Sequence, residues 1–124
     1  MKGQSTIMEE HVRICIYVRS NDRSSKLDTR LEELLEFAKQ HSLKVTKCIV
    51  EIDEAGDISR EGIKQLLRGL CDGEYEMILI TSIDTITKCG KEIHSFLETV
   101  ERYGKSLYSV GDGKKLTINS YSIS

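Results

Sequence analysis

The chain has 124 residues, of which 39% are hydrophobic and 31% are charged, and its formal net charge is −2. These values are typical of one globular domain that buries its own core, and they exclude a disordered chain. The N-terminal segment lacks the apolar stretch of a signal peptide, and no apolar run approaches the roughly 20 residues needed to span a bilayer, so we expect a cytoplasmic protein.

The first half of the chain predicts a strand, a helix and a second strand. After a polar lead-in over residues 1–11, residues 12–19 (VRICIYVR) are apolar on both faces, as in a strand that is covered on both sides. Ser25 followed by Asp28 indicates a capping box at the start of a helix. The apolar face of that helix comprises Leu27, Leu31, Leu34, Leu35 and Ala38. Residues 44–52 predict the second strand.

The second half predicts two more helices and three more strands. A loop over residues 53–58 contains Gly56, and Ser59 is a candidate cap for a helix that Gly73 ends. A strand over 76–81, a loop over 82–88 and a helix over 89–103 follow, and Gly104 ends that helix. A strand over 105–110 then leads through a tight Gly-Asp-Gly turn into an antiparallel edge strand over 116–123. The inward residues of the two helices are Ile63, Leu66, Leu67 and Leu70, and Ile93, Phe96, Leu97 and Val100.

This alternation predicts the α/β class, with a three-layer, open, mostly parallel sheet and helices on both faces. We expect residues 12–124 to form a single domain without a cofactor or a metal site. The cysteines lie too far apart in sequence for a zinc motif. We interpret Cys15, Cys48 and Cys71 as small buried hydrophobic residues and place Cys89 near a helix N-terminus.

Ligands of an open parallel sheet bind beyond the carboxyl ends of its strands, which singles out the loops at residues 19–25, 53–60 and 82–88. These loops would bring the cations Arg19, Arg60 and Lys88 beside hydroxyls and carboxylates, an arrangement that could hold a phosphate. The alternative is an ordinary solvated rim of mixed charge. No G-x-G-x-x-G or P-loop motif follows the first strand, which argues against those nucleotide folds.

Four segments resemble the catalytic domain of resolvase/invertase-type serine recombinases. Residues 16–19 (IYVR) resemble the Y-x-R-x-S segment of that family, and residues 53–67 resemble its second-strand loop and helix. Residues 80–88 (ITSIDTITK) resemble its K-L-D-R-L-x-R signature, and residues 107–110 resemble the strand after its third helix. The resemblance implies a resolvase-like fold. It also implies a serine hydroxyl that attacks a DNA phosphodiester to form a phosphoserine link, with cations stabilising the phosphate charge.

The resemblance assigns roles to four residues of this chain. Arg19 matches the arginine two positions before the nucleophile, and Arg60 matches the arginine that opens the second helix. Asp84 matches the aspartate of the signature, and Asp53 matches the acidic residue of the second-strand loop.

The departures from the family pattern fall on the chemistry. The nucleophile position is Asn21, whose carboxamide is no comparable nucleophile. Thr85 replaces the arginine after the aspartate, and Lys88 keeps a charge but loses the guanidinium fork that suits a phosphate. Ser20 is the alternative nucleophile, but a shift of one residue along a strand turns a side chain to the opposite face.

We interpret the chain as a resolvase-family site-specific recombinase catalytic domain that is degenerate and catalytically impaired. Two alternatives stay open: an active, divergent recombinase that uses Ser20, and a small α/β phosphate- or nucleotide-binding module without recombinase activity. The net charge and the lack of a helix-turn-helix segment predict that DNA binding is weak or depends on a missing module. Pairing with a second copy or a related recombinase is a further expectation. The interpretation requires Arg19, Arg60 and Asp84 to meet around the nucleophile position.

Overall fold

The computed structural model describes residues 11–20, 25–52 and 60–121. Its elements are β1 (Arg13–Ser20), α2 (Ser25–Gln40), β2 (Lys44–Ile52), α3 (Glu61–Cys71), β3 (Met77–Ile80), the 3-10 turn η1 (Ile83–Thr85), α4 (Gly90–Arg102), β4 (Ser106–Ser109), β5 (Lys114–Leu116) and the 3-10 turn η2 (Ile118–Tyr121). No helix in the described ranges is both long and apolar enough to cross a bilayer.

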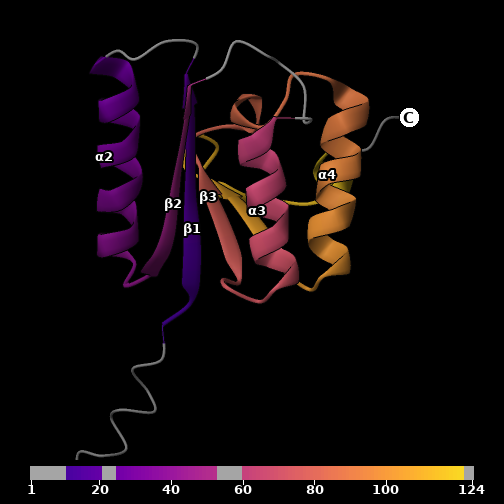
Figure 1. The fold of residues 1–124 in the computed structure, drawn as a ribbon, viewed down its shortest axis with the longest axis horizontal. Coiled ribbons are helices and arrows are strands. Elements are labelled where there is room, and N and C mark those ends of the chain that lie inside the picture. The colour runs from indigo at the N-terminus through magenta and orange to yellow at the C-terminus, as the bar shows by residue number, and fades with distance from the viewer. Residues whose placement is uncertain (1–10, 21–24, 53–59, 122–124) are drawn as a thin grey trace, which may run out of the picture.

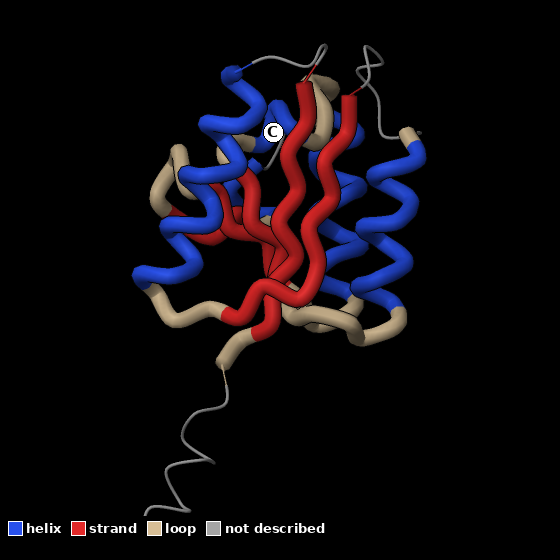
Figure 2. The backbone as a smooth tube through the Cα atoms, turned by 60° about the vertical axis from the view of Figure 1, so that its left-hand side comes forward, coloured by secondary structure: helices blue, strands red, loops and turns tan. Residues whose placement is uncertain are grey.

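The five strands form one sheet in the order β2-β1-β3-β4-β5. β1 to β4 are parallel, and β5 runs antiparallel to β4 at the edge. Helix α2 covers one face of the sheet, while α3 and α4 cover the other, and the strands run between the two helical layers (Figures 1 and 2). The predicted three-layer α/β architecture is therefore confirmed, including its antiparallel edge strand.

The alternation of β1 divides the core into two layers. Ile14, Ile16 and Val18 pack on the α2 side with the buried side of that helix. Cys15 and Tyr17 belong to the larger layer beneath α3 and α4. Because each face of β1 is covered by a helix, the strand is apolar at every position from Ile14 to Val18, as its sequence predicts.

The C-terminal ends of α3 and α4 follow the predicted signals. Gly73 and Gly104 adopt positive φ angles of 73° and 72° just after α3 and α4, a conformation that glycine tolerates best. The N-cap of α3 is Arg60, whose side chain makes no capping hydrogen bond. The predicted cap Ser59 and the predicted turn at Gly56 lie outside the described residues.

Three predicted burials are wrong. Leu35 is 43% exposed, because it lies about 100° around α2 from the buried Leu34. Cys48 is exposed because β2 is an edge strand, and Cys71 is exposed at the last residue of α3. Only Cys15 is a buried small hydrophobic residue, as predicted.

The last predicted strand is also wrong in its extent. β5 ends at Leu116 because β4 is short. Its residues Leu107 to Ser109 pair with only three residues of β5, Lys114 to Leu116. The chain then leaves the sheet: the backbone N–H of Ile118 donates a hydrogen bond to Oε2 of Glu101 on α4, 2.8 Å away. The 3-10 turn η2 therefore occupies positions where alternation predicted a strand.

Candidate active site at the carboxyl ends of the strands

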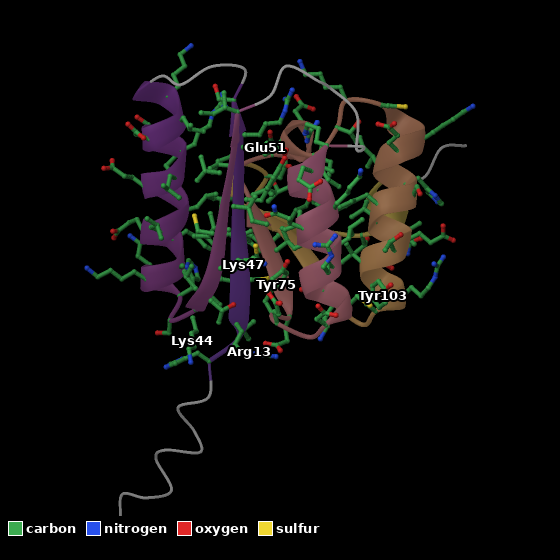
Figure 3. All side chains as sticks on the ribbon, viewed as in Figure 1. Arg13, Lys44, Lys47, Glu51, Tyr75 and Tyr103 are labelled. Atoms are coloured by element: carbon green, nitrogen blue, oxygen red, sulfur yellow. The ribbon has the colours of Figure 1, made fainter. Side chains whose placement is uncertain are left out.

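The carboxyl ends of β1 and β2 meet at one edge of the sheet. Arg19 pairs with Glu51, and Ser20 pairs with Ile52, so these four residues lie together at the end of the parallel ladder. Figure 3 shows Glu51 at the upper end of the sheet, opposite to Arg13 and Lys44 at its lower end. This is the edge where the sequence predicts a site.

Arg60 lies at the centre of this edge and is only 3% exposed. Its Nη2 donates hydrogen bonds to the Tyr17 hydroxyl (3.1 Å) and to the carbonyl oxygens of Thr85 (3.0 Å) and Ile86 (2.7 Å). Its Nε donates to Oε1 of Glu51 at 3.3 Å. One guanidinium therefore connects β1, β2, the start of α3 and the η1 turn.

Glu51 supplies the negative charge for this group. Its Oε1 accepts a 2.5 Å hydrogen bond from the Tyr17 hydroxyl, and its Oε2 accepts one from the backbone N–H of Gly62 at 2.8 Å. The side chains of Arg60 and Glu51 are 1% and 11% exposed, so their ion pair is buried. The buried ion pair is tolerated because both carboxylate oxygens and the guanidinium form hydrogen bonds within the protein.

Burial and the neighbouring Glu51 carboxylate raise the pKa of the Tyr17 hydroxyl, and the nearby Arg60 guanidinium opposes this only in part. Tyr17 therefore stays protonated at neutral pH and donates to Glu51 while it accepts from Arg60.

The first turn of α3 requires glycine next to this carboxylate. A Cβ at Gly62 would lie 2.6 Å from Cδ of Glu51, which is closer than real Cβ contacts allow. The absent side chain lets the N–H of Gly62 approach Glu51, and the carboxylate then satisfies one of the unpaired N–H groups of the helix N-terminus.

Strand alternation separates Arg19 from Ser20. Arg19 shares the face of Tyr17 and pairs with Glu51, whereas Ser20 shares the α2 face of Val18. Both side chains are half-buried. Ser20 is therefore on the opposite face of β1 from the Tyr17 side that carries Arg60.

The η1 turn adds the predicted signature residues to the same edge. Thr85 is half-buried, its carbonyl accepts from Arg60, and its hydroxyl lies 3.3 Å from that of Thr81. Asp84 is exposed in the same turn, and Lys88 is exposed just before α4. The structure thus brings Arg19, Arg60 and Asp84 to one edge, while Asn21 and Asp53 lie outside the described residues.

The start of α4, next to Lys88, is fixed by Thr87, which is 1% exposed. Its hydroxyl donates to Oε1 of Glu92 at 2.6 Å and accepts from the backbone N–H of Cys89 at 3.1 Å. Cys89 is the exposed N-cap residue of α4, close to where the sequence places it.

Two features of the site differ from expectation. Arg60 does not point outward as a phosphate-binding cation, because its side chain is buried against Glu51 and Tyr17. Glu51 was not singled out from the sequence, although it lies two residues beyond the buried Ile49 and therefore on the same face of β2. Asp53, which the resemblance assigned as the acidic residue, stays a prediction.

Comparisons with known proteins agree with this architecture. The family model described as "Resolvase, N terminal domain" matches residues 14–121. The N-terminal catalytic domain of TP901-1 integrase is 14% identical with a TM-score of 0.75, over 83% of this chain and 80% of that chain. The C-terminal catalytic domain of ISC1926 TnpA, an IS607-like serine recombinase, is 22% identical with a TM-score of 0.74, over 80% and 70% of the two chains.

A resolvase family site-specific recombinase from Streptococcus pneumoniae is 15% identical with a TM-score of 0.74, over 84% of this chain and 75% of that chain. A search of curated protein sequences gave no significant match. At these identities the solved structures establish the shared fold, and the family model spans nearly all of the described sheet and helices. The chain therefore belongs to the resolvase N-terminal domain family.

Proposed function

We propose that this chain is a resolvase-family recombinase catalytic domain that has DNA as its partner but has lost strand cleavage through a phosphoserine link. The observation that carries the proposal is the alternation at the end of β1. Arg19 lies on the face of Glu51 and Tyr17, whereas Ser20 lies on the opposite face with Val18. The one serine next to the family's nucleophile position is thus turned away from Arg60, and the position itself is Asn21.

The charges at the same edge support this proposal. A phosphoryl transfer needs cations preorganised around the phosphate oxygens. Thr85 replaces one family arginine, Lys88 offers a point charge without a guanidinium fork, and the Arg60 guanidinium is bound within the protein. With the exposed Asp84 close by, this edge would attract a DNA backbone only weakly.

Because this edge would bind the DNA backbone only weakly, stable DNA binding would require contacts from another module or another subunit. We therefore propose that the chain engages DNA together with a second copy of itself or a related recombinase. Because its proposed partner is DNA, we expect it to act in the cytoplasm, the compartment that its sequence predicts.

The direct test is a search for a covalent protein–DNA adduct. The chain is incubated with supercoiled DNA, quenched with detergent, and analysed by denaturing electrophoresis and intact mass. We expect no adduct from the unaltered chain or from the Ser20→Ala variant. An adduct that forms with the unaltered chain and disappears in Ser20→Ala would show that Ser20 is a working nucleophile and would overturn the proposal.

A variant with Asn21→Ser, Thr85→Arg and Lys88→Arg tests the assignment of the cleft. We expect it to bind DNA on the order of tenfold more tightly at low salt, because two guanidinium groups join the phosphate-binding edge. The matched control carries Asn21→Ala with the same two arginines. It should bind DNA as tightly as the first variant, because the gain comes from the two guanidinium groups and not from the hydroxyl. Equal affinity of the unaltered chain and both variants would mean that DNA does not bind at this edge.

A further inference from the structure

The edge strand β2 carries a continuous row of exposed apolar side chains on its α2 face. Val45, Cys48 and Val50 pair with Ile14, Ile16 and Val18 of β1, and Ile52 pairs with Ser20, so all four point to the α2 side. Val45, Val50 and Ile52 are 36%, 44% and 39% exposed, and Cys48 is exposed as well. We call Val45, Cys48, Val50 and Ile52 the β2 stripe.

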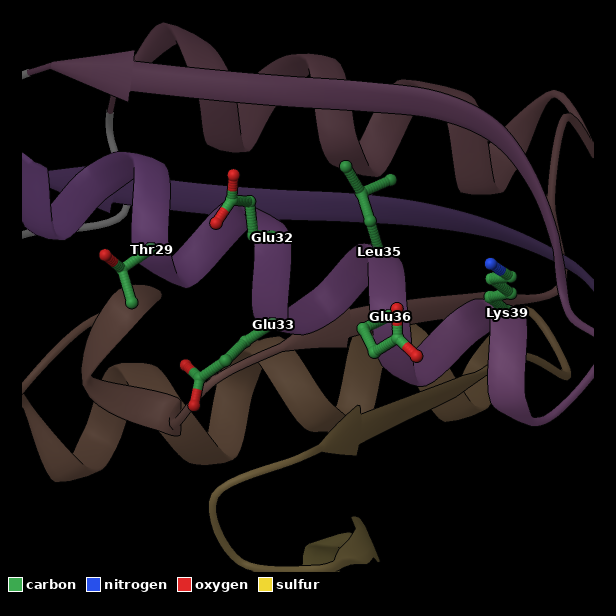
Figure 4. Close-up of a pocket in the computed structure, with 6 residues that line it drawn as sticks. All are labelled: Thr29, Glu32, Glu33, Leu35, Glu36 and Lys39. Carbon is green, nitrogen blue, oxygen red and sulfur yellow. The ribbon is translucent and has the colours of Figure 1, made fainter.

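The β2 stripe is uncovered because α2 lies over the neighbouring strand. The buried side of α2, formed by Leu27, Leu34 and Ala38, packs in the same layer as the apolar residues of β1. Leu35, on the flank of α2, is left 43% exposed. In Figure 4, Leu35 projects from α2 on the side where β2 runs.

Most of the large exposed apolar side chains cluster at this surface, as they do at interaction sites. Among the described residues six large hydrophobic side chains are exposed, and four of them are Leu35, Val45, Val50 and Ile52. Single exposed apolar residues are common on proteins, whereas contiguous ones mark interaction sites. The stripe also lies on the longest strand of the sheet, which has β1 on one side and no described strand on the other. The outer backbone of such an edge can pair with another strand.

We propose that the β2 edge and its stripe pair with the same surface of a second copy of this chain, with the two β2 strands antiparallel about a two-fold axis. This inference deepens the pairing in the proposed function and rests on it for the kind of partner. A two-fold interface must be self-complementary, since each surface meets its own copy. The stripe meets this requirement because apolar residues run along the full length of β2.

The charges on both elements favour the antiparallel arrangement. Lys44 and Lys47 both lie in the first half of β2. Antiparallel pairing keeps the lysines of the two copies apart, whereas parallel pairing in register would place them side by side.

The outer side of α2 carries one pair of opposite charges that a two-fold contact would match. Its shallow hollow is lined by Thr29, Glu32, Glu33, Leu35, Glu36 and Lys39 (Figure 4). Glu32 and Lys39 stand one turn to either side of Leu35. A two-fold axis near Leu35 therefore brings Glu32 of one copy toward Lys39 of the second copy.

Sedimentation equilibrium of the unaltered chain is the first test, with a dimer expected at micromolar concentrations. Val50→Lys places a charge in the stripe and should weaken the dimer by more than tenfold. Tyr103→Lys is the matched control, because Tyr103 is nearly as exposed as Val50 (43% against 44%) but lies at the end of α4. A chain that stays monomeric at every concentration, or a dimer that both variants weaken equally, would overturn the inference.

Charge reversal tests the geometry with substitutions at exposed positions of α2 that leave the core intact. Glu32→Lys and Lys39→Glu should each weaken the dimer several-fold, and the two together should restore it, since the pair reforms with its signs exchanged. Two single effects that add in the double variant would exclude the two-fold contact.

Cross-linking locates the contact independently. In a variant with Cys71→Ser and Cys89→Ser, Cys48 is the remaining exposed thiol, because Cys15 is buried. A short bis-maleimide should join two copies through Cys48, and Val50→Lys should suppress this product. Failure to cross-link a chain that sediments as a dimer would place the interface elsewhere. A covalent DNA adduct would overturn the proposed loss of cleavage without changing any of these outcomes.

Discussion

The carboxylate of Glu51, at the end of β2, accepts a hydrogen bond from the backbone N–H of Gly62 in the first turn of α3, at 2.8 Å. This contact joins an edge strand to a helix, through two residues that are 11 positions apart in the chain. The same carboxylate holds Arg60 and Tyr17, so the stability of the site and the stability of the helix start depend on one side chain.

Replacing Gly62 with alanine should destabilise the protein by about 1–3 kcal/mol, the usual cost of forcing a side chain into a packed site. The new Cβ would meet the Glu51 carboxylate. Urea unfolding followed by circular dichroism measures the change. Gly90→Ala is the matched control in the first turn of α4, where a Cβ meets nothing within 4 Å. Equal stability of Gly62→Ala and the unaltered chain would refute the tight contact.

Replacing Glu51 with glutamine should cost about 3–5 kcal/mol, because it leaves the Arg60 guanidinium buried without a counter-charge. Glu74→Gln is the control, since the exposed pair of Glu74 with Lys47 should contribute about 0–1 kcal/mol. The test is the free energy of unfolding of the two variants, measured side by side. A loss no larger than that of the control would mean that Glu51 and Arg60 do not form a buried pair.

Replacing Tyr17 with phenylalanine should cost about 1–3 kcal/mol, because Glu51 and Arg60 each lose a buried hydrogen-bond partner. The effect should not add to that of Glu51→Gln, since the two residues share one network. A double-mutant cycle on unfolding free energies measures this coupling. Tyr103→Phe, at a tyrosine that is 43% exposed, should cost much less. Strict additivity would argue against the network.

Alkaline pH should weaken the fold through Cys15. Burial raises the pKa of this thiol from 9.0 to about 12. A folded-state pKa above the unfolded one gives stability that is complete below pH 9 and is lost as pH rises toward 12, because only the unfolded chain then releases the proton. The expected slope is about 1.4 kcal/mol per pH unit for this one group. Cys15→Ala should flatten the slope just above pH 9, and an unchanged slope would contradict the assignment.

DNA binding should depend on Lys88. A lysine that contacts one phosphate contributes about 0.9 to the slope of log K against log salt, so Lys88→Ala should lower that slope by about this amount. Fluorescence anisotropy with labelled duplex DNA over a range of salt concentrations measures it. Lys44→Ala removes an equal charge at the opposite end of the sheet (Figure 3) and should leave the slope nearly unchanged. Equal effects of both variants would indicate non-specific attraction only.

The order of strands and helices was predictable because each element carries its own signal. Apolar positions from Ile14 to Val18 identify a strand covered on both faces, and the spacing of Ile93, Phe96, Leu97 and Val100 identifies a helix. Glycines at 73 and 104 mark helix ends by their positive φ angles. The parallel ladder then places the carboxyl ends of β1, β2 and β3 at one edge.

Which of the apolar side chains are covered was not predictable from periodicity. Leu35, Cys48 and Cys71 fit apolar patterns, yet all are exposed. A hydrophobic pattern gives the direction in which a side chain points but not whether another element covers it. The position of α2 over β1, which leaves Val45, Val50 and Ile52 of β2 exposed, depends on packing across the whole layer.

The sequence by itself determined the α/β class, the mostly parallel sheet and the edge at which Arg19, Arg60 and Asp84 gather, since these depend on local periodicity and on the rule for parallel strands. Only the tertiary structure decided that Arg60 is buried against Glu51 and Tyr17 rather than open to a phosphate. The reason is that a charged side chain enters the interior only where distant residues supply its counter-charge and hydrogen bonds, and that supply is a property of the packed fold.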